Sequence, residues 1–161
     1  MRILGIDPGI ATTGFAILQS NGPNSKPLDF GFISTEKHLG NANRLTQLAT
    51  DLKEICHKWK PDVCAVEELF FSKNTKTAIQ VSQARGVILQ TLNQAGYPIY
   101  EYNPGQIKIA ITGHGKATKA EIQKMVTLIL KLKQIPRPDD AADALAIALC
   151  HAHTILHAPA L

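Results

Sequence analysis

Four carboxylates are the residues of this sequence best suited to chemistry. Asp7 and Glu67 each end a short apolar run of the kind that forms a buried strand. Asp140 and Asp143 lie three residues apart near the start of an Ala- and Leu-rich segment, so they share one face of a predicted helix. Burying carboxylates together is costly unless cations lie between them. We therefore expect these acids to bind Mg²⁺, or Mn²⁺ in its place, through their oxygen atoms.

Two divalent ions roughly 4 Å apart are the known device for in-line hydrolysis of a phosphodiester bond. A second interpretation of each acid stays open at this point. Asp7-Pro8-Gly9 is also ordinary turn chemistry, and acids in the first turn of a helix stabilise its dipole and cap free N–H groups. Two apolar strands that both end in an acid favour the metal site over either acid alone.

The charge distribution points to an anionic polymer as partner. Residues 69–138 hold ten Lys or Arg and only two acids, whereas the whole chain has a net charge of +4. A basic middle beside isolated carboxylates is typical of proteins that bind nucleic acid, although a solvated basic surface has the same composition.

The remaining composition indicates an ordinary globular protein of 161 residues, expected to form one domain over residues 1–161. Its three cysteines are widely spaced without a Cys-x-x-Cys pair, which predicts small buried residues in a reducing compartment. The first strand begins at the N-terminus, and no apolar run approaches the length of a membrane span. We therefore expect a cytoplasmic protein without a signal peptide.

Apolar periodicity predicts an α/β fold with a mixed five-stranded sheet, a three-strand antiparallel meander plus two parallel strands, flanked by helices. Strands are expected over 3–6, 15–18, 28–33, 63–66 and 97–100, and a hairpin loop over 21–27. Helices are expected over 45–59, 75–95, 104–111, from the capping box Thr118-x-x-Glu121 to Leu130, and from Asp139 to about Leu156. The 75–95 segment is apolar around most of its circumference, so a second chain is expected to cover one side. His151, His153 and His157 are interpreted as a partly solvated helix end rather than a metal site.

This order of elements and acids resembles the ribonuclease H-like fold, and more narrowly the RuvC family of Holliday-junction resolvases. The motifs that carry the resemblance span nearly the whole chain: Gly5-Ile6-Asp7-Pro8-Gly9 with Thr13-Gly14, Val66-Glu67 with Phe70, Lys73-Asn74, Gln83-Ala84-Arg85-Gly86, and Asp140-Ala141-Ala142-Asp143-Ala144-Leu145-Ala146. Each motif is short, and their specificity comes from occurring together in the right order.

The resemblance implies roles for particular residues. Asp7, Glu67, Asp140 and Asp143 match the family's metal-binding catalytic acids, with Asp7 bridging two Mg²⁺ ions. Phe70 matches the aromatic residue that stacks at the junction centre, and Lys108 and Lys119 match basic residues near the scissile phosphate. Further candidate DNA contacts are Phe71, Lys73, Lys76, Arg85, Lys116 and Lys124.

Two departures leave alternatives open. Asp139 directly precedes the expected pair and makes an Asp139/Asp143 register conceivable, although the Asp-Ala-Ala-Asp spacing favours Asp140. Glu68 follows Glu67, but adjacent strand residues face opposite ways, so we expect it not to be a ligand.

The resemblance implies a Mg²⁺-dependent homodimer that resolves four-way DNA junctions by paired nicks, leaving 5′-phosphate and 3′-hydroxyl ends, together with the branch-migration proteins RuvA and RuvB. A non-catalytic junction-binding module is the main alternative, and four retained acids disfavour it. An actin-like phosphotransferase also opens with strand-Asp-x-Gly, but it needs two domains and a longer chain.

Overall fold

Five strands and five helices make up the part of the chain that the computed structural model describes, residues 1–21, 24–69 and 75–156. The strands are β1 (Arg2–Asp7), β2 (Thr12–Asn21), β3 (Asn24–Ser34), β4 (Val63–Glu67) and β5 (Ile99–Tyr102). The helices are α1 (Asn41–Trp59), α2 (Thr75–Gln94), α3 (Pro104–Thr112), α4 (Lys119–Ile129) and α5 (Asp139–Leu156). None of these helices is long and apolar enough to cross a membrane.

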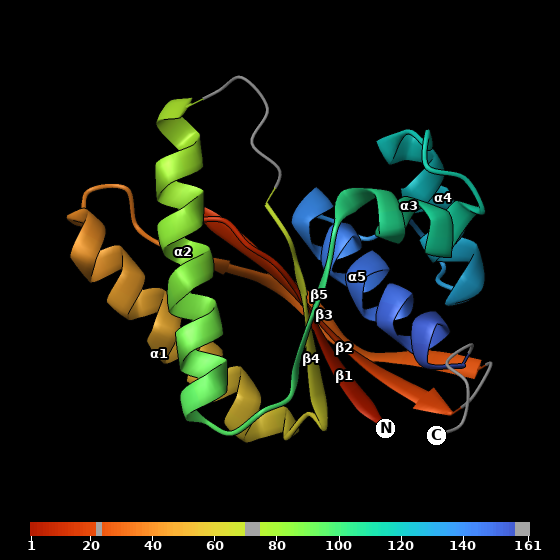
Figure 1. Ribbon diagram of the computed structural model, residues 1–161, viewed down its shortest axis with the longest axis horizontal. Helices are drawn as coiled ribbons and strands as arrows, with labels where there is room; N and C mark the ends of the chain where they lie inside the picture. Colours follow the sequence, from red (N-terminus) through yellow and green to blue (C-terminus); the bar gives the residue numbers. More distant parts are fainter. Residues whose placement is uncertain (22–23, 70–74, 157–161) are drawn as a thin grey trace.

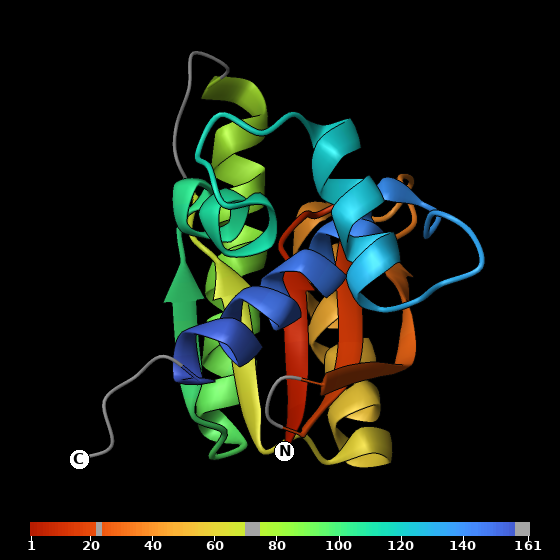
Figure 2. The same cartoon turned by 90° about the vertical axis from the view of Figure 1, so that its right-hand side faces the viewer.

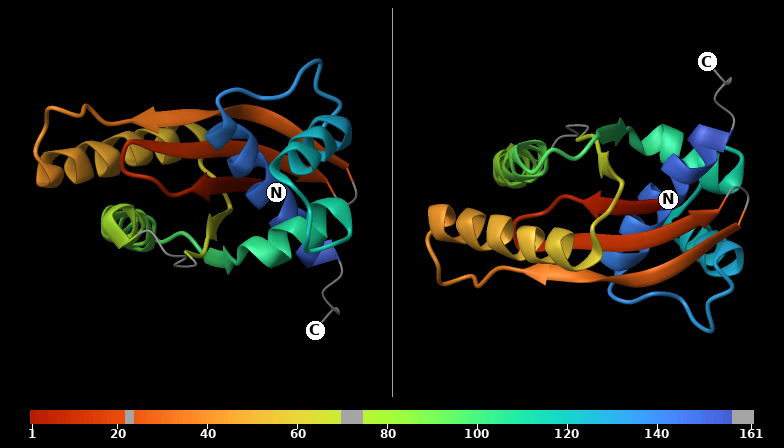
Figure 3. Two further views of the ribbon diagram at one scale, coloured as in Figure 1. Left: turned by 90° about the horizontal axis from the view of Figure 1, so that it is seen from above. Right: turned by 90° about the horizontal axis from the view of Figure 1, so that it is seen from below.

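The strands form one mixed sheet in the order β3-β2-β1-β4-β5. β1, β2 and β3 pair antiparallel, whereas β4 runs parallel to both β1 and β5. Helices α1 and α2 lie on one side of the sheet, and α3, α4 and α5 lie on the other (Figures 1 and 3). The predicted fold class, an α/β protein with a three-strand meander plus two parallel strands, is confirmed.

Strand alternation divides the core into two layers and sets the direction of each acid. Leu4 and Ile6 of β1 pack toward α1 and α2, while Ile3 packs toward α5. In β4, Val66 faces the first layer and Ala65 the second. Because successive side chains in a strand point to opposite faces, the acids that end β1 and β4 both point to the α5 side.

Helix α5 crosses one face of the sheet (Figure 2), and glycines in β1 and β2 let the helix backbone contact the strands. A Cβ atom on Gly5 would overlap the carbonyl oxygen of Ala144 and lie 2.8 Å from the backbone nitrogen of Ala148. A Cβ atom on Gly14 would overlap the carbonyl oxygen of Asp140. Glycine at these two strand positions therefore sets the height of α5, and of the acids it carries, above β1 and β2.

The ends of the C-terminal helices follow local signals. Thr118 caps α4 in a reciprocal capping box with Glu121, as the sequence predicts. Asn103 and Gln106 form a second capping box at α3, and Gly113 ends that helix with a positive φ of 84°. These caps set the ends of α3 and α4, which both pack against α5 and lie beside it in Figure 2.

Three predictions were wrong in detail. The strand predicted over 97–100 begins and ends two residues later, at Ile99–Tyr102. The hairpin loop predicted over 21–27 is shorter, because β3 already begins at Asn24; Pro27 is tolerated there since β3 is an edge strand. His151 is not at a solvated helix end: it is 1% exposed, and its Nδ1 lies 2.7 Å from the Tyr102 hydroxyl. His153 is partly exposed, as expected, and His157 lies outside the described residues. The three cysteines are buried and free, as expected.

We predict that Gly5→Ala lowers the free energy of unfolding by about 1–3 kcal/mol, the usual cost of overpacking. The added methyl group meets helix backbone, which cannot rotate away as a side chain can. Gly31→Ala is the matched control in the same sheet, because its Cβ atom meets only the Phe15 ring, at 3.3 Å. Urea unfolding curves measure both variants, and equal stabilities would contradict close packing of α5 on Gly5.

Candidate active site

The carboxylates of Asp7 and Glu67 lie at the carboxyl ends of two neighbouring strands of the sheet, β1 and β4. β1 and β4 are parallel neighbours, in register from Ile3 opposite Val63 to Ile6 opposite Val66, and each acid follows as the next residue. Both side chains are partly buried. The sheet therefore brings together two like charges that are 60 residues apart in the sequence.

Helix α5 adds the other two predicted acids at this edge. The backbone of Asp140 packs on Gly14, which pairs with Asp7 across β1 and β2. One turn later, Asp143 lies beside Lys119 of α4, with 2.9 Å between the carboxylate oxygen and Nζ. The structure thus places the four predicted acids around the ends of β1 and β4.

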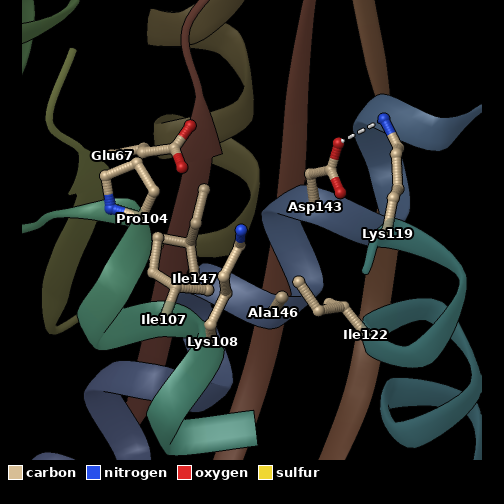
Figure 4. A pocket seen from close by; sticks show the side chains of 9 residues that line it. All are labelled: Glu67, Pro104, Ile107, Lys108, Lys119, Ile122, Asp143, Ala146 and Ile147. Carbon is tan, nitrogen blue, oxygen red and sulfur yellow. Dashed lines mark ion pairs between the residues drawn. The ribbon is translucent and has the colours of Figure 1, made fainter. Parts of the chain in front are cut away.

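A pocket of about 220 Å³ opens between β4, α3, α4 and α5 at this edge. Glu67, Asp143, Lys108 and Lys119 supply its charged groups, and its apolar lining is Pro104, Ile107, Ile122, Ala146 and Ile147. In Figure 4 the amine of Lys108 points toward the space between the Glu67 and Asp143 carboxylates. The pocket therefore joins two of the predicted acids to Lys108 and Lys119, two of the predicted basic residues.

The crowding of these acids perturbs their pKa values. Burial and then the charges of Glu67, Asp143 and Asp140 raise the pKa of Asp7 to about 8. Burial also raises the pKa of Glu67, with Asp143 adding to the effect. Burial raises the pKa of Asp143 as well, although Lys119 opposes it. Near neutral pH, the protein alone does not stabilise all of these negative charges.

Lys119 is the cation that partly compensates them. Burial lowers the pKa of Lys119, but its contacts with Asp143 and Asp139 outweigh this and raise the pKa above its usual value. Asp139 lies 3.6 Å from Lys119 and 3.0 Å from Arg137. A hydrogen bond from Gln123, together with these two cations, lowers the pKa of Asp139. Asp139 is thus satisfied by protein partners.

The carboxylate oxygens of these acids are suitable ligands for a hard divalent cation. In this structure, however, the four carboxylates do not converge on one point. Over the described ranges, no three His, Cys, Asp or Glu side chains are grouped so that they could hold a metal ion. Asp143 is engaged by Lys119 instead. Asp7, Glu67 and Asp140 form no ion pair within 4.0 Å in the part of the chain that is described. Oxygen-only donors with excess negative charge fit Mg²⁺ or Mn²⁺ once Asp143 is freed.

Hydrogen bonds that the sequence analysis did not predict hold the turn after Asp7. The hydroxyl of Thr13, which is 1% exposed, donates to the Gly9 carbonyl and accepts from the Gly9 amide. Thr35 donates to the Ile10 carbonyl, and Arg44 of α1 donates to Thr35 at 2.9 Å. These bonds fix the backbone that leaves β1, and so the direction of Asp7.

The other predicted DNA contacts are distributed differently. Phe70, Phe71 and Lys73 lie outside the described residues, and Lys76 lies in the first turn of α2 with an undescribed side chain. Lys116 and Lys124 are exposed, on the α3–α4 loop and on α4. Arg85 instead lies among protein partners, donating to the Glu67 carbonyl at 3.1 Å and pairing with Glu101.

Comparison with known proteins agrees with this geometry. Residues 3–151 match the family described as crossover junction endodeoxyribonuclease RuvC. The chain belongs to the RuvC family. A RuvC from Caldicellulosiruptor saccharolyticus is 55% identical over 152 residues, which cover 94% of this chain and 92% of that protein.

Solved RuvC structures share the fold over almost the whole chain. Thermus thermophilus RuvC superposes with a TM-score of 0.89 at 38% identity, covering 96% of this chain and 95% of the other. The same protein in complex with a Holliday junction substrate gives a TM-score of 0.87 at 35% identity, with the same coverage. Membership in the RuvC family makes this protein a nuclease, and divalent-metal dependence follows for the family in general.

We predict that the metal-free protein loses stability as pH rises from about 4 to about 8. Because the folded pKa of Asp7 exceeds its ordinary value of 3.8, the folded state binds more protons in this window. At about 1.4 kcal/mol per pKa unit, the loss is at most roughly 6 kcal/mol, reduced by water that reaches a partly exposed side chain. Asp7→Asn should flatten the pH profile and be the more stable protein at pH 8. Urea unfolding in a chelator measures this, and parallel profiles for the two proteins would contradict it.

We also predict that Lys119→Met tightens Mg²⁺ binding, because it removes the cation that competes for Asp143. The Mg²⁺ concentration giving half of the maximal rise in melting temperature should fall several-fold. Lys116→Met, at an exposed position outside the pocket, is the control and should leave this midpoint unchanged. An equal or weaker Mg²⁺ response in Lys119→Met would mean that the ion pair does not oppose metal binding.

Proposed function

We propose that this protein resolves four-way DNA junctions by hydrolysing one phosphodiester bond in each of two opposed strands. The main support is the pocket that Glu67 of β4 and Asp143 of α5 line together with Lys108 and Lys119. The chain also belongs to the RuvC family. A basic excess of eight charges over residues 69–138 suits a polyanionic substrate. A related RuvC of the same fold has been solved with a Holliday junction.

Asp7, Glu67, Asp140 and Asp143 would hold two Mg²⁺ ions. When bound, such ions supply an activated water and stabilise the leaving 3′-oxygen, which leaves a 5′-phosphate on the other fragment. The chain's own contribution is to hold the acids rigidly: β1 and β4 fix two of them, and the Gly14 contact fixes the start of α5. Lys108 and Lys119 would attract and orient the scissile phosphate. Phe70 would stack at the junction centre, where base stacking is worth roughly 1–3 kcal/mol.

The proposed working unit is a homodimer related by a two-fold axis through α2. The side of α2 that faces the sheet is fully buried at Ala84, Ile88 and Leu92. On the outer side, Ile79 is 65% exposed, and Gly86 leaves open space where a side chain would stand. A two-fold interface pairs one patch with itself and presents one acid cluster to each of two strands. We also propose that the dimer acts in the bacterial cytoplasm with a branch-migration complex of RuvA and RuvB.

The direct test of the function is cleavage of a labelled four-way junction. We expect wild-type protein to make paired nicks only with a divalent metal. Asp7→Asn should lower the rate at least a thousandfold while junction affinity stays equal or increases, because the change removes a proposed metal ligand and no proposed contact with DNA. Binding by wild type without any nicking across Mg²⁺ and Mn²⁺ titrations would favour a non-catalytic junction-binding module.

The dimer has its own test in sedimentation at micromolar concentration. Ile79→Glu should yield monomers, because it buries a charge in the proposed interface. Leu128→Glu on α4 is the matched control, since Leu128 is similarly exposed, at 60%, but lies on another helix. Dimers that persist in Ile79→Glu and dissociate in Leu128→Glu would move the interface to α4.

A further inference from the structure

Arg85 of α2 forms a hydrogen bond with β4, the strand that carries Glu67. Its Nε donates to the backbone carbonyl of Glu67 at 3.1 Å, and its Nη2 pairs with the carboxylate of Glu101 on β5. The Arg85 side chain is only 20% exposed, and that of Glu101 is 40% exposed. The guanidinium thus joins α2 to two adjacent strands at the edge where the acids gather.

This contact is made from behind the site. Val66 and Glu101 are cross-strand neighbours, and Val66 packs toward α2, so Glu101 projects to the α2 side of the sheet. The Glu67 side chain projects to the opposite side, into the pocket. Arg85 therefore holds the Glu67 main chain without standing between its carboxylate and the substrate.

The geometry requires arginine in particular. A planar guanidinium presents several N–H donors in a fixed fork and can satisfy a carbonyl and a carboxylate together. A lysine ammonium on a flexible stem keeps the charge but not this arrangement. Glu101 already neutralises the charge of Arg85, so little of it is left for a DNA phosphate.

We propose that Arg85 is a positioning residue for the metal-binding carboxylate of Glu67, held in place by Glu101, rather than a phosphate contact. Its link to cleavage rests on the proposed function. The effect of Arg85 on Mg²⁺ binding is independent of DNA cleavage, because Mg²⁺ binding is measured without DNA. Residues that orient metal ligands from behind change metal affinity or activity by about 10–100-fold when removed.

The test uses Arg85→Gln, Arg85→Lys, Glu101→Gln and the exchange Arg85→Glu with Glu101→Arg. The two glutamine variants and Arg85→Lys should each raise the Mg²⁺ midpoint for thermal stabilisation about tenfold. They should lower kcat on a junction to a similar extent, with KM and the salt dependence of binding unchanged, and excess Mg²⁺ should restore part of the rate. The two glutamine changes combined should cost little more than either alone. The exchange should recover part of the Mg²⁺ response. Lys58→Gln removes a surface ion pair with Asp29, 3.2 Å long, and is the control that should change nothing.

Other outcomes overturn the proposal. If Arg85 contacts a phosphate, then Arg85→Gln weakens junction binding and lowers the salt slope by about one, while Arg85→Lys and Glu101→Gln keep the wild-type Mg²⁺ midpoint. If Arg85→Gln fails to fold, Arg85→Lys and Glu101→Gln decide, since a normal Mg²⁺ midpoint in both refutes a positioning role. Wild-type protein that binds Mg²⁺ but nicks no junction would instead refute the proposed function, with the Mg²⁺ comparison still valid.

Discussion

Carboxylates repel one another where β1 and β4 end, and the segments packed around these strand ends accommodate that repulsion. Asp7 and Glu67 are adjacent because β1 and β4 are parallel neighbours, and burial with like charges raises both pKa values. A protein selected for stability alone would not retain such a cluster, since unpaired buried charges destabilise folding. The fold tolerates it through Lys119, and a divalent cation would relieve it further.

Several contacts position the acids at the carboxyl ends of β1 and β4. Gly5 and Gly14 let α5 approach the sheet, so Asp140 and Asp143 stand beside Asp7. The hydroxyl of Thr13 fixes the turn that follows Asp7, and Arg85 grips the backbone of Glu67. The glycines and polar side chains of these motifs thus help to position the carboxylates.

Most strands, most helices and the grouping of the acids were predictable from the sequence, because local sequence preferences agree with the tertiary structure. The capping box at Thr118 marked the start of α4, and the apolar runs that end in Asp7 and Glu67 marked β1 and β4. Contacts between distant segments were not predictable. No periodicity relates Arg85 to Glu101, or His151 to Tyr102, because each pair meets only after the sheet and helices have packed. The length of the β2–β3 hairpin was missed since Pro27 resembles a loop residue, and only its place on an edge strand allows it.

Proton release on metal binding would show whether these acids hold protons in the metal-free protein. Ligand carboxylates must lose their protons to bind a metal, and the pKa of Asp7 near 8 means that it is largely protonated at pH 7 without one. Calorimetric titration of Mg²⁺ at pH 7, in buffers of different ionisation enthalpy, counts the protons released. We expect close to one proton or more to be released per active site in the wild type and clearly fewer in Asp7→Asn. Tight Mg²⁺ binding with no proton released would contradict it, because the acids would then be ionised and stable without metal.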